Sequence, residues 1–212
     1  MAHAVQPWIA VVREVELPAN AERDVQSAFE EGSRWWREQM DRAFEVAPTV
    51  VHHSPSTFEK LYKKYGETNN IWFALQREAH EAGVLDNCDA ERAHYMIGLG
   101  GEMGGGMVGS ENFGCAHVLP GKAAITGGFA YTLLGLDPTA HGHPAQPWFA
   151  SERRNAIGAL MHELGHMLGD GVAHPLDHTS DDKNLMFGWW NWPDVSFTSE
   201  QIEQLSGSPF LQ

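Results

Sequence analysis

Residues 162–169 have the sequence His-Glu-Leu-Gly-His-Met-Leu-Gly, and they determine how the rest of the chain is interpreted. In a helix, residues four apart lie on the same face, so His162 and His166 would be neighbours one turn apart. Two imidazoles in this arrangement can bind one metal ion, and neutral imidazole suits zinc. Glu163 would lie about 100° around the helix from His162, beside the metal but not bound to it. The segment therefore predicts a zinc site with Glu163 as a general base for water.

The flanking sequence favours a helix that ends just after His166. Ser151 is expected at the N-cap, and Gly169 is expected to adopt the left-handed conformation that ends many helices. The apolar residues follow the spacing of one buried helical stripe: Ile157, Leu160, Met161, Leu164 and Leu168. A sharp turn at Gly169 can bring a third ligand back to the metal, as a catalytic zinc site with one open position requires.

Further along, residues 184–187 have the sequence Asn-Leu-Met-Phe. Together with the histidine motif, this segment resembles the metzincin clan of zinc endopeptidases, whose signature is H-E-x-x-H-x-x-G-x-x-H followed by a turn that carries a methionine. His162, Glu163 and His166 match that signature by position, and Met186 resembles the methionine of the turn. The resemblance implies a zinc-dependent endopeptidase with one catalytic Zn²⁺, which hydrolyses peptide bonds by a water molecule at the metal with Glu163 as its base.

The chain departs from the family signature at the third histidine. That histidine would fall at position 172, which is Val172, and the nearest later histidine is His174. Because a proline follows it, His174 resembles the His-Pro pair that closes the motif in serralysins. We therefore favour His174 as the third zinc ligand, on a slightly longer loop, and keep His178 and Asp170 as alternatives. Other carboxylates of the same segment could also reach the metal: Asp177, Asp181 and Asp182.

The resemblance also implies the fold. We expect a metzincin-like α+β fold in one catalytic domain over residues 1–212. An upper lobe, about residues 1–169, would hold a twisted, mostly parallel sheet and the active-site helix. A lower lobe, about residues 170–212, would be irregular and end in a helix, with zinc in the cleft between the lobes. Ala123 to Thr126 is expected to be the edge strand that pairs with an extended substrate.

Hydrophobic periodicity and capping signals predict the other elements. Strands are expected at residues 9–17, 46–52 and 93–98, and helices at 20–44, 56–66, 69–82 and from 198 onward. Capping boxes are expected at Ser56 to Glu59 and at Thr198 to Gln201. The glycine-rich segment 98–109 lacks the pattern of a phosphate-binding loop, and we interpret it as a mobile loop over the cleft, with a plain surface connection as the alternative.

The composition limits the partners. The formal net charge is -14, from 28 acidic and 14 basic side chains, which argues against nucleic acid and anionic membranes. No run approaches the roughly 18 apolar residues of a membrane-spanning helix. We expect a monomer that acts on peptide or protein substrates.

The apolar stretch from Trp8 to Val12 is too short for a signal-peptide core, which needs about 7–15 residues. The family resemblance favours a secreted or extracellular protein, with a cytoplasmic location as the alternative.

Several residues leave alternatives open. Cys88 and Cys115 could form one disulfide or stay as two thiols. His141 and His143 could hold a second metal or be ordinary loop histidines. The tryptophans after the methionine could form an apolar wall of the specificity pocket or simply pack to fold their own loop: Trp189, Trp190 and Trp192.

Two other functions compete with the endopeptidase. In a gluzincin-type peptidase the third ligand is a later glutamate, and Glu200 and Glu203 are available, but this leaves His174 and Met186 without a role. A zinc-containing protein that binds peptides without cleaving them is the other alternative. A structural zinc site usually has four closed protein ligands and does not need a base such as Glu163.

Overall fold

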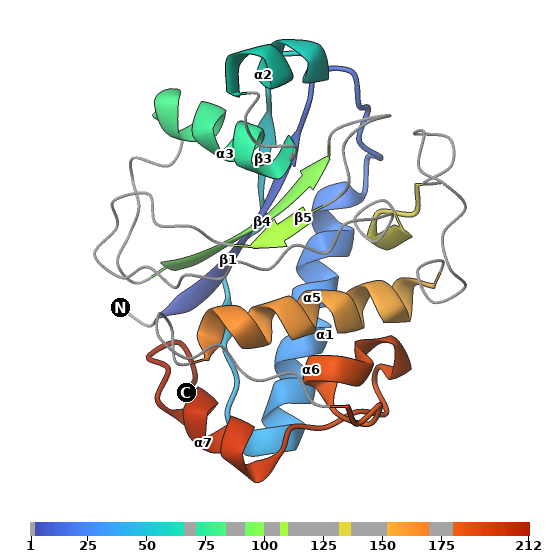
Figure 1. Cartoon of the computed structure of the whole chain (residues 1–212), viewed down its shortest axis with the longest axis vertical. Coiled ribbons are helices and arrows are strands. Elements are labelled where there is room, and N and C mark those ends of the chain that lie inside the picture. The colour runs from blue at the N-terminus through green and yellow to red at the C-terminus, as the bar shows by residue number, and fades with distance from the viewer. Residues whose placement is uncertain are drawn as a thin grey trace.

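A mixed sheet lies at the centre of the fold, and four of its five described strands are parallel (Figure 1). The computed structural model describes residues 3–65, 71–83, 92–99, 107–109, 132–136, 152–169 and 180–212. The strands in these ranges are β1 (Ala4–Val11), β2 (Glu45–Val46), β3 (Val50–His53), β4 (Arg92–Leu99) and β5 (Met107–Gly109). Helices together with a small, mainly parallel sheet agree with the expected α+β class.

β1 is the central strand. β4 pairs with it in parallel along its whole length, from Ala4 opposite Arg92 to Val11 opposite Leu99, and β5 runs antiparallel on the far side of β4. A central parallel strand is covered on both faces, so it is apolar throughout instead of alternating. In β1 every residue except Gln6 is buried.

On the other side of β1, the strand expected at 46–52 is two short strands. β2 pairs with Ala4 and Val5, β3 pairs with residues 8–11, and Pro7 lies opposite the gap between them. Proline has no N–H to donate, so a continuous partner strand would meet a missing ladder bond at this point. The prediction of one continuous strand was therefore wrong, because the register of the sheet places Pro7 opposite the middle of that strand.

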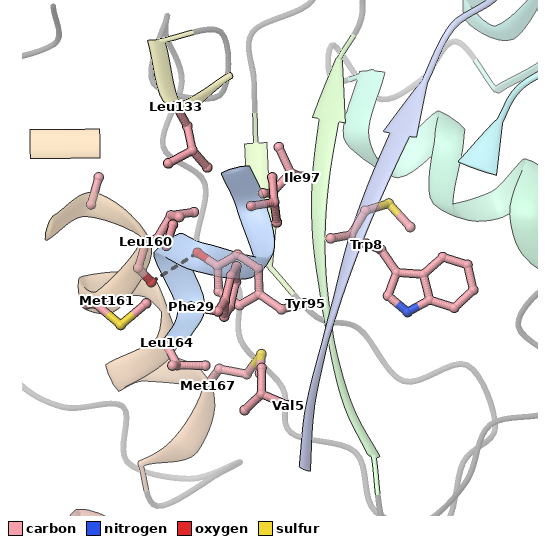
Figure 2. Packing of buried hydrophobic residues seen from close by; sticks show 14 of the residues in the cluster. Val5, Trp8, Phe29, Tyr95, Ile97, Leu133, Leu160, Met161, Leu164 and Met167 are labelled. Carbon is pink, nitrogen blue, oxygen red and sulfur yellow. Dashed lines mark hydrogen bonds between the residues drawn. The ribbon is translucent and has the colours of Figure 1, made fainter. Parts of the chain in front are cut away.

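Helices cover both faces of the sheet. The described helices are α1 (Ala21–Met40), α2 (Phe58–Tyr65), α3 (Ile71–Glu81), α5 (Arg153–Leu168), α6 (Leu185–Gly188), the 3-10 helix η4 (Trp189–Asn191) and α7 (Ser199–Ser206). Tyr95 of β4 points toward α1, where its ring lies 5.0 Å from that of Phe29, whereas Trp8 of β1 points to the opposite face (Figure 2). On that second face His52 of β3 lies against Glu78 of α3.

α5 lies between the sheet and the C-terminal segment that contains α6 and α7 (Figure 1). Because it is covered from both sides, 13 of its 16 residues are buried, well beyond the single stripe expected from the sequence. Two glycines allow this close packing. A Cβ on Gly32 of α1 would overlap the side chain of Met161, and a Cβ on Gly158 would overlap the carbonyl oxygen of Trp189.

Several predicted boundaries need correction. β1 begins at Ala4 and ends at Val11, not at 9 and 17. α1 ends at Met40, short of the expected residue 44, because Asp41 adopts a left-handed conformation with φ 54°. At the start of α2 the capping hydroxyl belongs to Thr57, which accepts a hydrogen bond from the Lys60 amide, one residue after the predicted position.

The ends of α5 also differ from the prediction. The N-cap position is Glu152, and its side chain makes no capping hydrogen bond. Gly169 follows the last helical residue as expected, but its φ of -62° and ψ of -167° are extended, so the predicted left-handed conformation is wrong. The C-terminal capping box is confirmed, because Thr198 and Gln201 satisfy each other's backbone amides at the start of α7.

Part of the glycine-rich segment is sheet and not loop, since Gly98 lies in β4 and Gly109 in β5. Other predicted features lie outside the described residues: the strand at 123–126, Ser151, Asp170, His174, Asp177, His178, Cys88, Cys115, His141 and His143. Of the helices that the structure describes, none combines the length and the apolar character needed to cross a membrane.

Candidate metal centre

His162, Glu163 and His166 come together on one side of α5. One potential ligand atom from each lies within 4.8 Å of the others, and no other group of three or more such side chains occurs within the described ranges. The two imidazole rings meet edge to face, with centroids 4.9 Å apart. The helical spacing of the sequence thus places these three side chains as expected.

The orientation of His162 depends on a main-chain group of α6. Its Nδ1 lies 3.1 Å from the carbonyl oxygen of Leu185. Because a carbonyl can only accept, this hydrogen bond requires the proton on Nδ1, which leaves a lone pair on Nε2. Nε2 in turn lies 3.8 Å from Oε1 of Glu163. A histidine that donates one ring N–H to a carbonyl and offers the other nitrogen is the usual form of a metal-binding histidine.

Glu163 is a buried carboxyl group, with only 4% of the residue exposed. Loss of hydration raises the pKa of Glu163 from 4.5 to about 8. No group in the described part of the chain donates a hydrogen bond to its Oε2. A buried carboxyl without a donor is costly for a fold, and such perturbed groups are concentrated at functional sites.

A buried tyrosine supports α5 from the sheet. The hydroxyl of Tyr95 donates a hydrogen bond of 3.1 Å to the carbonyl oxygen of Leu160, one turn before Glu163 (Figure 2). Burial, and to a smaller extent the nearby Glu163, raise the pKa of Tyr95 well above its usual value, so the hydroxyl keeps its proton. The contact fixes the helix that carries the site to the central sheet.

The segment around Met186 is held by a network of amide groups. Oδ1 of Asn184 accepts a hydrogen bond from the Met186 amide at 2.8 Å and so caps α6. Nδ2 of Asn184 donates to Oε1 of Gln201 at 2.8 Å, and Gln201 belongs to the capping box of α7. Leu185, whose carbonyl orients His162, lies between the two residues of this cap. Met186 itself is fully buried.

Other candidate ligands that the structure describes do not join the site. Asp181 is exposed and accepts a hydrogen bond from the Lys183 amide. Asp182 is exposed, and so are Glu200 and Glu203 on α7. None of these carboxylates belongs to the cluster around His162.

The tryptophan segment packs, at least in part, into the hydrophobic core. Trp192 is only 2% exposed and packs against Trp35 of α1, with ring centroids 4.6 Å apart. Trp189 and Trp190 are half-buried. Of the two interpretations, Trp192 therefore follows the second: it belongs to the hydrophobic core and does not line a pocket.

Three of the groups that position the site could not be recognised in that role from the sequence. The Leu185 carbonyl carries no side-chain signature, and Gln201 and Tyr95 come from distant parts of the chain. Only Asn184 could have been found, since an asparagine directly before a short apolar segment is a common N-cap.

Comparisons of the chain with protein-family models, with curated proteins and with solved structures found no match.

Proposed function

We propose that the protein is a zinc-dependent endopeptidase of metzincin-like architecture, in which Glu163 is the catalytic base. The main support is the arrangement of His162, whose Nδ1 is engaged by the Leu185 carbonyl while its Nε2 faces the buried carboxyl of Glu163. Clusters of exposed acidic residues, which are common on protein surfaces, do not combine a buried carboxyl with an imidazole whose other nitrogen is held by a main-chain carbonyl. The family resemblance also leads us to propose a secreted monomer that acts on peptide or protein substrates.

The donor atoms present suit zinc. His162 and His166 supply two imidazoles within reach of one ion. Two imidazoles alone leave a zinc site incomplete, since catalytic sites use three protein ligands. We propose His174 as the third, from the loop that follows α5. When bound, zinc would supply Lewis acidity and lower the pKa of a coordinated water toward ~7.

Glu163 would then move the proton. Its carboxyl is held next to His162 and is itself buried, so it is shielded from bulk water. Burial alone keeps the carboxyl protonated near neutral pH, and a nearby divalent cation favours the ionised form. In that form Glu163 can take a proton from water and deliver it to the amine of the cleaved peptide.

The Glu163→Gln variant tests this proposal. It should keep its zinc content, because Glu163 is not a ligand, but cleave casein about 10²–10⁴-fold more slowly. Elemental analysis measures the zinc, and mass spectrometry of the fragments identifies internal cuts. As a matched control, the double variant Glu200→Gln with Glu203→Gln should keep both zinc and activity. If it loses zinc instead, the gluzincin arrangement is correct.

A wild-type protein that binds zinc and a hydroxamate inhibitor but cuts no peptide at any pH would support the non-catalytic alternative. The third ligand is tested separately. His174→Ala should lose zinc and activity, and His178→Ala should retain both. The reverse result, or loss of zinc only in Asp170→Ala, would show that the loop is aligned incorrectly.

A further inference from the structure

A hollow of about 510 Å³ lies where strands β1 and β3 end. Its lining comes from the loop after β1, the first turn of α1 and the end of β3. It shares no residue with the cluster of His162, Glu163 and His166. Its size falls within the range of roughly 300–1,000 Å³ that is usual for small-molecule pockets.

The connections of the sheet explain why a hollow forms at this place. β1 leads into α1, which covers the sheet face to which Tyr95 points (Figure 1). β3 leads into α2 and α3, and α3 covers the opposite face of the sheet, where its Glu78 lies against His52. β1 and β3 are parallel neighbours. When the connections of two such strands leave toward opposite faces, a crevice opens outside their carboxyl ends, and open parallel sheets commonly bind ligands there.

The floor of the hollow is apolar. Val15 and Ala21 are buried, at 5% and 3% exposure, and Val51 and Leu17 are half-buried. The loop that contributes Val15 is fixed at its start, because the Arg13 amide donates a hydrogen bond of 3.0 Å to the Ser56 carbonyl. The floor is therefore a defined surface that can cover an apolar group.

The rim carries both signs of charge. Arg13 and His53 can be positive, and Glu16 and Glu22 are negative; all four are exposed. In the part of the chain that the structure describes, none of the four side chains forms a hydrogen bond or an ion pair with another residue. By contrast, Glu14 from the same loop is engaged, because it accepts a hydrogen bond from the Phe58 amide. The four rim groups thus stay available to a ligand.

We propose that this crevice binds a small zwitterion with an apolar side chain, either a free amino acid or a short peptide. The carboxylate of the ligand pairs with Arg13, its ammonium group pairs with Glu16 or Glu22, and its side chain covers the floor around Val15. A plain anion would meet the two glutamates, and a plain cation would meet Arg13. A ligand that carries both charges satisfies both sides of the rim.

Four probes separate the contributions. L-leucine and leucyl-leucine carry both charges, N-acetyl-leucine lacks the ammonium group, and leucine amide lacks the carboxylate. We expect the zwitterions to bind the full chain and each incomplete analogue to bind about tenfold more weakly, since a charged hydrogen bond in an open site is worth about that factor. Methyl NMR locates the binding: signals of Val15 and Val51 should shift, while those of Leu164 on α5 should not.

Variants then test the rim. Arg13→Gln should weaken leucine binding about tenfold, whereas Arg34→Gln, at an exposed position of α1 away from the hollow, should not change it. Binding of leucine alone would assign the crevice to amino acids, and binding of leucyl-leucine alone would assign it to short peptides; both results support a zwitterion site. The proposal is overturned if neither zwitterion shifts the valine signals, if the analogues bind as well as leucine, or if Arg13→Gln binds like wild type. Because the readout is binding at β1 and β3, these results do not depend on peptidase activity.

Discussion

Asn184→Ala should reduce both the stability of the protein and its affinity for zinc. Asn184 is 3% exposed, and two donors point at its Oδ1: the Met186 amide at 2.8 Å and Nε2 of Gln201 at 3.3 Å. Alanine leaves both donors buried without this acceptor. A loss of about 1–1.5 kcal/mol for each gives an expected destabilisation of about 2–3 kcal/mol.

The effect on zinc follows from the position of Leu185 inside the same cap. Its carbonyl accepts the proton of His162 Nδ1, so a looser α6 lets the imidazole rotate. Loss of such support for a metal ligand typically costs 10–100-fold in metal affinity, and we expect an effect of about that size.

Urea unfolding of the metal-free protein, followed by tryptophan fluorescence, measures the first effect. The midpoint should fall while the m value stays unchanged, because the folded state buries the same surface. Competition with a zinc-binding dye measures the second effect. Asn191→Ala is the matched control: it removes one hydrogen bond, to the Asp182 carbonyl, from a more exposed asparagine of the same segment, and should cost less than about 1 kcal/mol. If Asn184→Ala unfolds at the wild-type midpoint, the cap does not stabilise this region. If it is destabilised but binds zinc like wild type, the link from Asn184 through Leu185 to His162 is wrong.

Two further predictions concern packing and pH. Gly158→Ala should destabilise the protein by about 1–3 kcal/mol, because its Cβ would overlap the rigid carbonyl of Trp189. Thermal unfolding measures this effect, and an unchanged Tm would contradict the packing of α5 on η4. For His52, burial lowers the pKa below 6.5 despite the opposing effect of Glu78, so the unfolded chain binds a proton that the folded chain does not. The contribution of His52 to stability should therefore decrease as the pH falls from about 6.5 toward the lowered pKa, while Glu163 contributes in the opposite direction. Relative to wild type, His52→Gln should lack this loss at low pH, and urea unfolding of both proteins at several pH values would show equal slopes if this is wrong.

The parts that the sequence predicted correctly are those encoded over short distances. The pair of His162 and His166 depends only on helical spacing, and the capping box of Thr198 and Gln201 spans four consecutive residues. Both are local and need no information about the rest of the chain. The same holds for the end of α5 at Gly169, although not for the conformation of that glycine.

The parts that the sequence missed depend on the register of the sheet or on packing between distant segments. The gap between β2 and β3 becomes predictable only once Pro7 is known to face that edge of β1. The burial of α5 on nearly all sides requires both the sheet and η4 to be in place. The hydrogen bond from Tyr95 to α5 joins residues 65 positions apart, a separation at which no local pattern operates.

Glu163 is a buried carboxyl in the middle of α5, and this bears on what the helix is for. Its raised pKa means that, between pH 4.5 and about 8, the folded metal-free chain holds a proton that the unfolded chain releases. The folded state accordingly loses stability as the pH rises through that range, so at neutral pH the carboxyl is a burden on the fold. A leucine or methionine would fill the same space at no such cost.

Sequences that specify one structure usually keep a buried, unpaired polar group only where function requires it. The hydrogen bond from Tyr95, the glycine contacts at positions 32 and 158 and the amide network of Asn184 surround this costly group with well-packed structure. They allow α5 to hold a carboxyl beside two imidazoles, the arrangement that the proposed zinc site requires.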